Sequence, residues 1–81
     1  MSKAEKLLLR FLSLPKDFTY SELKTILAHF EYVEVQSAGS RVCFKKNKHN
    51  IKLHKPHPGN ILKQYQQTLV INELKKEGLI K

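Results

Sequence analysis

The hydrophobic periodicity of this chain switches from helical spacing to strand-like alternation near residue 31, and that change restricts the fold more than any other feature. Before it, apolar residues recur at helical spacing in two segments. Between residues 32 and 54, apolar and polar residues instead alternate in three short runs, which is the pattern of half-buried strands. A chain of 81 residues is long enough for one small core. We therefore expect a single α+β domain spanning residues 1–81.

Two helices are expected before the strands. The first covers residues 4–12 and ends before Pro15, because the residue that precedes a proline disfavours helical backbone angles. The second begins at Thr19 and Glu22, which stand at the spacing of a capping box. Leu23, Ile26 and later apolar residues then form one stripe along this helix.

The three alternating runs are joined by short links, which indicates an antiparallel meander. One side of this sheet is apolar and should pack on the helices. It consists of Val33, Val35, Val42, Phe44, Ile51 and Leu53. The opposite side should remain open and carry Arg41, Cys43, Lys45, Lys52 and His54. Periodicity alone therefore predicts a cationic sheet face that bears one histidine.

The C-terminal segment is less regular. Ile61, Leu62, Tyr65 and Leu69 define one helical stripe, with which Val70, Ile71 and Leu74 are out of phase. We expect a turn after Gly59 and then a helix from about residue 68 to residue 77, followed by Gly78 at its C′ position. The last five elements then resemble the α-β-β-β-α layout of double-stranded-RNA-binding domains, with an extra N-terminal helix.

The charge of the chain is concentrated in its middle. The net charge is +8, yet no acidic residue lies between Glu34 and Glu73. That stretch holds Arg41, Lys45, Lys46, Lys48, Lys52, Lys55 and Lys63, together with His49, His54 and His57. Such a block favours a polyanion as partner, above all a nucleic acid, whereas a merely solvated surface usually includes glutamates.

The composition excludes cysteine-based cross-links within the chain and a membrane-spanning segment. Cys43 is the only cysteine, so the chain can form neither an internal disulfide nor a cysteine zinc site. No segment approaches the roughly 20 apolar residues that a membrane span needs. We expect a cytoplasmic protein that uses no membrane.

Several short segments, in order, match a known family. They are Ser21, Glu22 and Leu23 at a helix start, Ala38, Gly39 and Ser40 before the second strand, Phe44 within it, residues 55–60 (Lys-Pro-His-Pro-Gly-Asn) after the third strand, and Leu74, Gly78 and Leu79 near the end. With them, residues 19–80 resemble the HicA family, the messenger-RNA-cleaving toxins of HicA–HicB toxin–antitoxin pairs. Residues 1–14 lie outside this core and resemble a helical extension of some members.

The resemblance implies metal-independent RNA cleavage with no cofactor, and a HicB-like antitoxin that binds the chain and blocks its RNA surface. The catalytic residue of the family is a histidine directly after the Gly-Ser pair, where this chain has Arg41. Arginine keeps its proton and cannot act as a general base, although it can hold a phosphate or stabilise charge in the transition state. Binding can therefore survive while the usual chemistry is lost or reassigned.

Reassignment would use the two nearby histidines. RNA cleavage without metal needs a base for the 2′-hydroxyl and an acid for the leaving 5′-oxygen, and imidazole suits both roles. His57 stands where a histidine recurs in the family, and His54 precedes it by three residues, so both are catalytic candidates. The RNA-binding candidates are Ser40, Arg41, Lys45, Lys52 and Lys55.

Alternatives stay open at this stage. Pro56 and Pro58 could simply form a rigid strand exit whose histidines bind phosphate or cap a turn, and two histidine nitrogens alone are a poor metal site. Tyr32 and Tyr65 could stack on unpaired bases, although Tyr32 fits a sheet edge and Tyr65 fits the core stripe. The chain is then either a ribonuclease toxin or a non-catalytic RNA-binding module on the same fold. A DNA-binding regulator is a weaker reading, since no recognition helix is evident.

Overall fold

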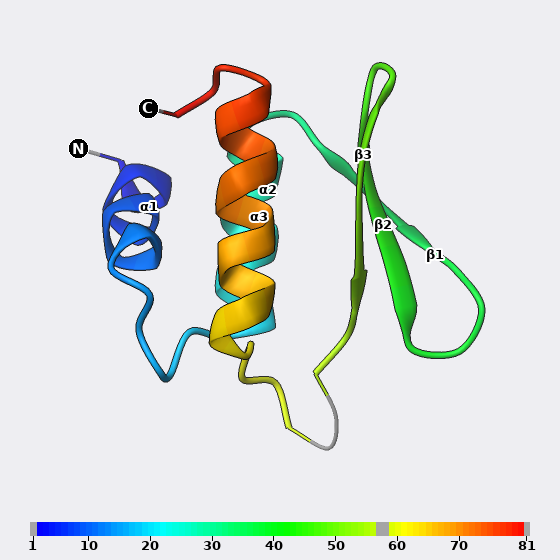
Figure 1. The fold of residues 1–81 in the computed structure, drawn as a ribbon, viewed down its shortest axis with the longest axis horizontal. Helices are drawn as coiled ribbons and strands as arrows, with labels where there is room; N and C mark the ends of the chain where they lie inside the picture. Colours follow the sequence, from blue (N-terminus) through cyan, green and yellow to red (C-terminus); the bar gives the residue numbers. More distant parts are fainter. Residues whose placement is uncertain (1, 57–58, 81) are drawn as a thin grey trace.

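The computed structural model describes residues 2–56 and 59–80, which form an α+β domain of three helices and a three-stranded antiparallel sheet. The elements are α1 (Lys3–Leu12), α2 (Tyr20–His29), β1 (Val33–Gln36), β2 (Arg41–Lys46), β3 (His49–His54) and α3 (Gln64–Lys76). Both α2 and α3 lie on one face of the sheet, and α1 lies beyond them on the side away from the sheet (Figure 1). Within the described residues, no helix has the length and apolarity to cross a membrane.

The start of α2 forms as its sequence predicts. The side chain of Thr19 accepts a hydrogen bond from the N–H of Glu22 at 3.1 Å, and the carboxylate of Glu22 accepts one from the N–H of Thr19 at 3.0 Å. This reciprocal pair satisfies two backbone donors that the first turn of a helix cannot pair internally. The capping box is confirmed.

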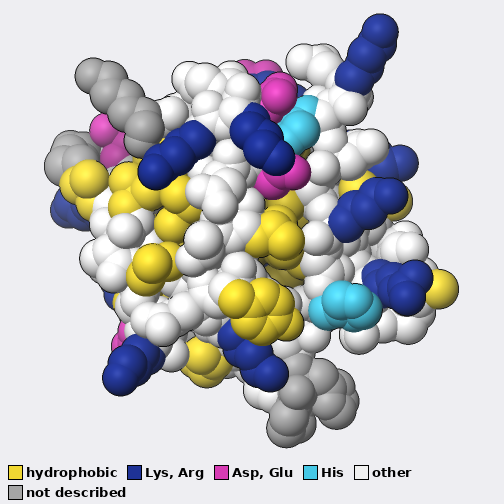
Figure 2. Space-filling view, viewed as in Figure 1, with side chains coloured by type: hydrophobic (Ala, Val, Ile, Leu, Met, Phe, Trp, Pro, Cys, Tyr) yellow, Lys and Arg dark blue, Asp and Glu magenta, His cyan; other side chains and the backbone are white. Residues whose placement is uncertain are grey.

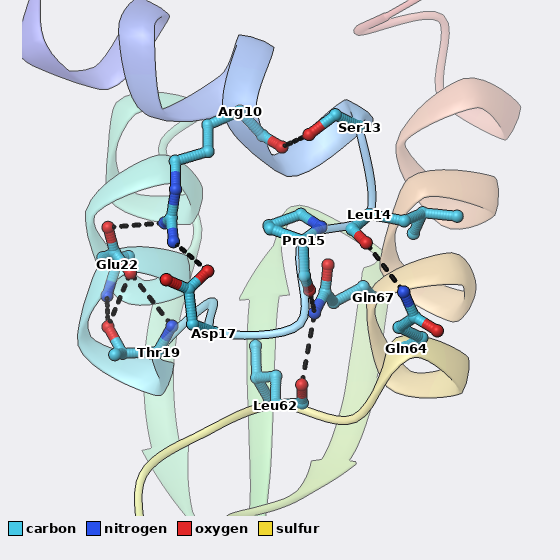
Figure 3. A network of polar contacts seen from close by, with 10 residues as sticks. All are labelled: Arg10, Ser13, Leu14, Pro15, Asp17, Thr19, Glu22, Leu62, Gln64 and Gln67. Atoms are coloured by element: carbon cyan, nitrogen blue, oxygen red, sulfur yellow. Dashed lines mark hydrogen bonds and ion pairs between the residues drawn. The ribbon is translucent and has the colours of Figure 1, made fainter.

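The N-terminal extension is part of the same folded unit. Phe11 of α1 is fully buried and packs on Phe18, with 4.8 Å between the ring centroids. Figure 3 shows how Arg10 reaches from α1 to Asp17 and Glu22, while the amide groups of Gln64 and Gln67 reach from α3 to the backbone of the α1–α2 connection. These contacts tie α1 to both other helices.

The second and third strands, β2 and β3, have the predicted orientation. Val42, Phe44, Ile51 and Leu53 are buried against the helices, together with Leu23, Ile26 and Leu27 of α2 and Val70, Ile71 and Leu74 of α3. The first strand is the exception. Val33 and Val35 are 64% and 39% exposed, and they pair with Lys45 and Cys43 on the open face. The expectation that these two valines face the helices is wrong.

The reversal of β1 has a polar cause. Its inward position is taken by Glu34, whose carboxylate accepts a hydrogen bond from the hydroxyl of Tyr20 and lies 3.4 Å from the ammonium of Lys24. The hydrogen bond from Tyr20 outweighs desolvation and, with the charge of Lys24, lowers the pKa of Glu34. Tyr32, just before β1, is also buried. Because side chains alternate along a strand, Glu34 points to the same inner side as Tyr32, and Val33 and Val35 point to the open face.

The last helix begins earlier and faces the core differently from our expectation. It starts at Gln64 rather than near residue 68, and Tyr65 is 67% exposed, so the prediction that Tyr65 belongs to the core stripe is wrong. Gln67 occupies the core instead, where its amide nitrogen donates to the carbonyls of Pro15 at 2.9 Å and Leu62 at 3.2 Å. Gly78, with φ of +70°, stands at C′ as predicted.

Candidate nucleic-acid interface

The open face of the sheet collects the basic residues of β2 and β3. Arg41 stands directly opposite His54, and Lys52 stands opposite Cys43. Residues paired in this way point to the same side of an antiparallel sheet, with their Cβ atoms roughly 4.5–5.5 Å apart. Lys45 points to this side as well, because it is two residues from Cys43. We call Arg41, Lys45, Lys52 and His54 the basic face, and their grouping is as the alternation predicts.

A shallow hollow of about 330 Å³ lies within this face, between β2 and β3. It is lined by Ser37, Arg41, Val42, Cys43, Lys52, Leu53 and His54. Cys43 forms part of its floor and is itself buried. Arg41, Lys52 and His54 place a guanidinium, an ammonium and an imidazole group around the hollow, and none of the described residues that line it carries a carboxylate.

The cations of the basic face have no anionic partner among residues 2–56 and 59–80. The ion pairs of this part of the chain involve Arg10, Lys24, His49 and Lys76, all of which lie elsewhere. Figure 2 shows basic side chains along the sheet side of the molecule. Cations that are both exposed and unpaired are free to neutralise the phosphates of a polyanion.

Ser40 and Lys55 lie at the edge of the basic face. The N–H of Lys55 donates to the carbonyl of Ser40 at 2.7 Å, which continues the β2–β3 pairing beyond Arg41 and His54. Lys55 is half-buried, and its charge adds to the effects of Tyr20 and Lys24 in lowering the pKa of Glu34. Since Glu34 lies on the helix side, Lys55 flanks the basic face and does not stand on it.

Of the two catalytic candidates, only His54 lies within the described residues. His54 is exposed, next to Arg41 across the strands, and its ring makes no hydrogen bond to any described residue. His57 lies outside the described residues. His54 with Arg41 is therefore the pair that the structure brings together.

A third histidine forms a cluster that we did not predict. At the other end of β3, the ring nitrogen Nδ1 of His49 lies 2.6 Å from the hydroxyl of Tyr32, and its Nε2 lies 3.6 Å from the carboxylate of Glu73 on α3. Burial, and then the negative charges of Glu77 and Glu73, raise the pKa of Tyr32. The alternation of β3 contained the signal, because His49 is in phase with the buried residues Ile51 and Leu53.

The chemistry available on the basic face is anion binding and proton transfer. A guanidinium can hold a phosphate through two parallel hydrogen bonds, and a neighbouring imidazole can accept or donate a proton. In residues 2–56 and 59–80, no three His, Cys, Asp or Glu side chains come together as a metal site. Comparison with protein-family models, curated proteins and solved structures gave no match to this chain.

Proposed function

We propose that this chain is an RNA-binding protein of the HicA type, built on an α-β-β-β-α fold like that of double-stranded-RNA-binding domains. In this proposal it acts in the cytoplasm as a metal-independent endoribonuclease on messenger RNA. The observation that supports it is the basic face, where three cations without an ion-pair partner among the described residues share one side of the sheet with the exposed His54.

The proposed reaction uses the pair across β2 and β3. Arg41 binds the scissile phosphate and stabilises the negative charge that grows on its oxygens in the transition state. Neutral His54 takes the proton of the 2′-hydroxyl, the 2′-oxygen forms the new bond to phosphorus, and the bond to the 5′-oxygen breaks. His57 is the candidate acid that protonates the leaving oxygen.

A second function, a non-catalytic RNA-binding module, rests on one residue. Arg41 occupies the position of the catalytic histidine in the family, and its guanidinium stays protonated at every physiological pH. The basic face then keeps its affinity for phosphate without the usual base. Both functions use the same surface and differ only in turnover.

Fluorescently labelled RNA in excess EDTA separates the two functions. Binding is read by anisotropy and cleavage by gel, for the wild type, His54→Ala, Arg41→Ala and the control His29→Ala. The control removes an exposed histidine of α2, which lies on the opposite side of the sheet from the basic face. Cleavage that His54→Ala abolishes while binding persists supports the nuclease. Binding without cleavage supports the module, and a wild type that does not bind RNA excludes both.

The proposed partner is a HicB-like antitoxin that covers the basic face. Expression of the chain alone should then arrest growth, and co-expression with a HicB-like protein encoded by an adjacent reading frame should relieve the arrest. The double variant Arg41→Ala and His54→Ala provides the matched control, because it should permit growth without any antitoxin. Equal growth arrest by the wild type and this variant would contradict the proposed role of the face.

A further inference from the structure

One aromatic side chain of the helix layer, in the turn of α3 that contacts the end of β3, is largely exposed. Tyr65, at 67%, is the most exposed of the large hydrophobic residues in the described chain, and it lies in the first turn of α3. The next residue, Gln66, donates its amide to the carbonyl of His54 at 2.9 Å. The turn that carries Tyr65 therefore sits against the end of β3 that carries the proposed base.

The direction of the Tyr65 side chain follows from its neighbours on the helix. Gln66 and Glu73, seven residues apart, both face β3, because one contacts His54 and the other approaches His49. Tyr65 and Leu69 are one turn apart and form the adjacent strip, which is also exposed. Figure 2 looks onto this side and shows hydrophobic side chains over α3 beside a histidine and basic side chains over β3.

The charged residues near Tyr65 in the sequence are all basic. Tyr65 lies within the segment between Glu34 and Glu73 that lacks acidic residues, and the exposed Lys63 stands at the N-cap of the same helix. Positive charge therefore continues along the chain from β3 to the start of α3, where Gln66 contacts the end of β3.

We propose that Tyr65 is a stacking platform for an unpaired base of an RNA whose backbone lies on the basic face, so that the substrate is single-stranded. This inference rests on the proposed function and specifies its substrate. Bases splayed from a single strand stack readily on aromatic rings, whereas the bases of a duplex are already paired and stacked. Tyr32, the other tyrosine considered for this role, is buried and engaged with His49.

Three short RNA ligands of equal length test the assignment: a uridine strand, the same strand with abasic riboses, and a duplex. The variants are Tyr65→Leu, which keeps an apolar side chain, and Tyr65→Phe, which keeps the ring. Leu9→Ala is the matched control, because Leu9 is an exposed apolar residue on α1, away from the sheet. Thermal melting verifies that each variant is folded.

Tyr65→Leu should weaken binding of the uridine strand by roughly five- to a hundredfold, while Tyr65→Phe and Leu9→Ala bind like the wild type. On the abasic strand, all four proteins should bind equally, because only the backbone remains to be held. Equal affinity of Tyr65→Leu and wild type for the uridine strand overturns the stacking role, as does preference of the wild type for the duplex. If the wild type binds none of the three RNAs, both the proposed function and the stacking role fail. If the wild type binds but Tyr65→Leu has no effect, Lys52→Ala shows which proposal has failed. Weaker binding by Lys52→Ala then keeps the basic face as the RNA site and contradicts only the stacking role of Tyr65.

Discussion

The two ends of β3 carry the same residue type in opposite settings. His54 stands on the open face beside Arg41, is exposed, and makes no ring hydrogen bond within the described residues. His49, five residues earlier, points toward the helices, where its ring contacts Tyr32 and approaches Glu73. An imidazole held by internal partners contributes to folding, whereas one that faces solvent next to unpaired cations is available to a ligand.

The electrostatic surroundings of the two ends differ in the same way. Around His49, the carboxylates of Glu73 and Glu77 accompany the ammonium groups of Lys46 and Lys76, so charges of both signs are present. Around His54, the described residues contribute only positive charge to the hollow. We therefore expect the His49 end to stabilise the fold, whereas the proposed function gives the His54 end a role in binding RNA. Substitutions at each end can contradict these two roles.

The largest effect is expected from charge reversal on the basic face. Arg41→Glu with Lys52→Glu should lower RNA affinity on the order of a hundredfold, because each change removes a charge-assisted contact to phosphate. The salt dependence of binding should also flatten, since fewer counterions are released. Anisotropy titrations over a range of salt concentrations measure both.

The control for this reversal makes the same change of net charge at the other end of the β2–β3 hairpin. Lys46→Glu with Lys48→Glu alters residues beside the His49 cluster. This control should keep most of the affinity. If the two double variants lose affinity equally, the RNA is held by the net charge of the chain, and the basic face has no special role.

The second effect concerns stability at the His49 end. His49→Ala should lower the free energy of unfolding by about 1–3 kcal/mol, because it leaves the buried hydroxyl of Tyr32 without its partner. His54→Ala removes an exposed ring and should change stability by less than about 0.5 kcal/mol. Urea unfolding monitored by circular dichroism gives both values. A larger loss for His54→Ala than for His49→Ala would invert the comparison.

The sequence predicted the basic face because alternation is a local property. Once β2 and β3 are paired without a slip, Arg41, Lys45, Lys52 and His54 must share a side. Two other features were not readable for physical reasons. In β1, Glu34 is inward because Tyr20 and Lys24, far away in sequence, satisfy it, and the core position of Gln67 likewise depends on carbonyls of Pro15 and Leu62. Tertiary hydrogen bonds of this kind reverse the apparent phase of an amphipathic segment.

The third prediction concerns how stability depends on pH. It compares Glu34, which points toward the helices, with charged residues that are exposed to solvent. The hydrogen bond from Tyr20 outweighs desolvation and lowers the pKa of Glu34 below that of an unfolded glutamate, which is about 4.3. Below that pH the unfolded chain binds the proton more readily, so this contribution to stability is present above about pH 4.3 and is lost as the pH falls through the folded pKa. Glu34→Gln should therefore reduce the loss of stability in acid.

Urea unfolding at a series of acidic pH values measures this effect. The control Glu31→Gln changes an exposed carboxylate that makes no ion pair among the described residues, and it should follow the wild type. Arg41→Ala, on the opposite side of the sheet, should also leave the acid dependence unchanged. Parallel pH profiles for Glu34→Gln and wild type would show that the inward carboxylate adds nothing to the acid response.

The smallest effect tests the side of the sheet on which β1 places its valines. Val33→Thr should change the free energy of unfolding by less than about 0.5 kcal/mol, because its side chain is on the open face and largely exposed. Val42→Thr, the same exchange at a buried position of β2, should cost about 1–3 kcal/mol, because it buries a hydroxyl among apolar side chains. Since the two exchanges are chemically identical, their difference reports burial alone. Equal costs would return Val33 to the core and would restore the orientation that simple alternation predicts for β1.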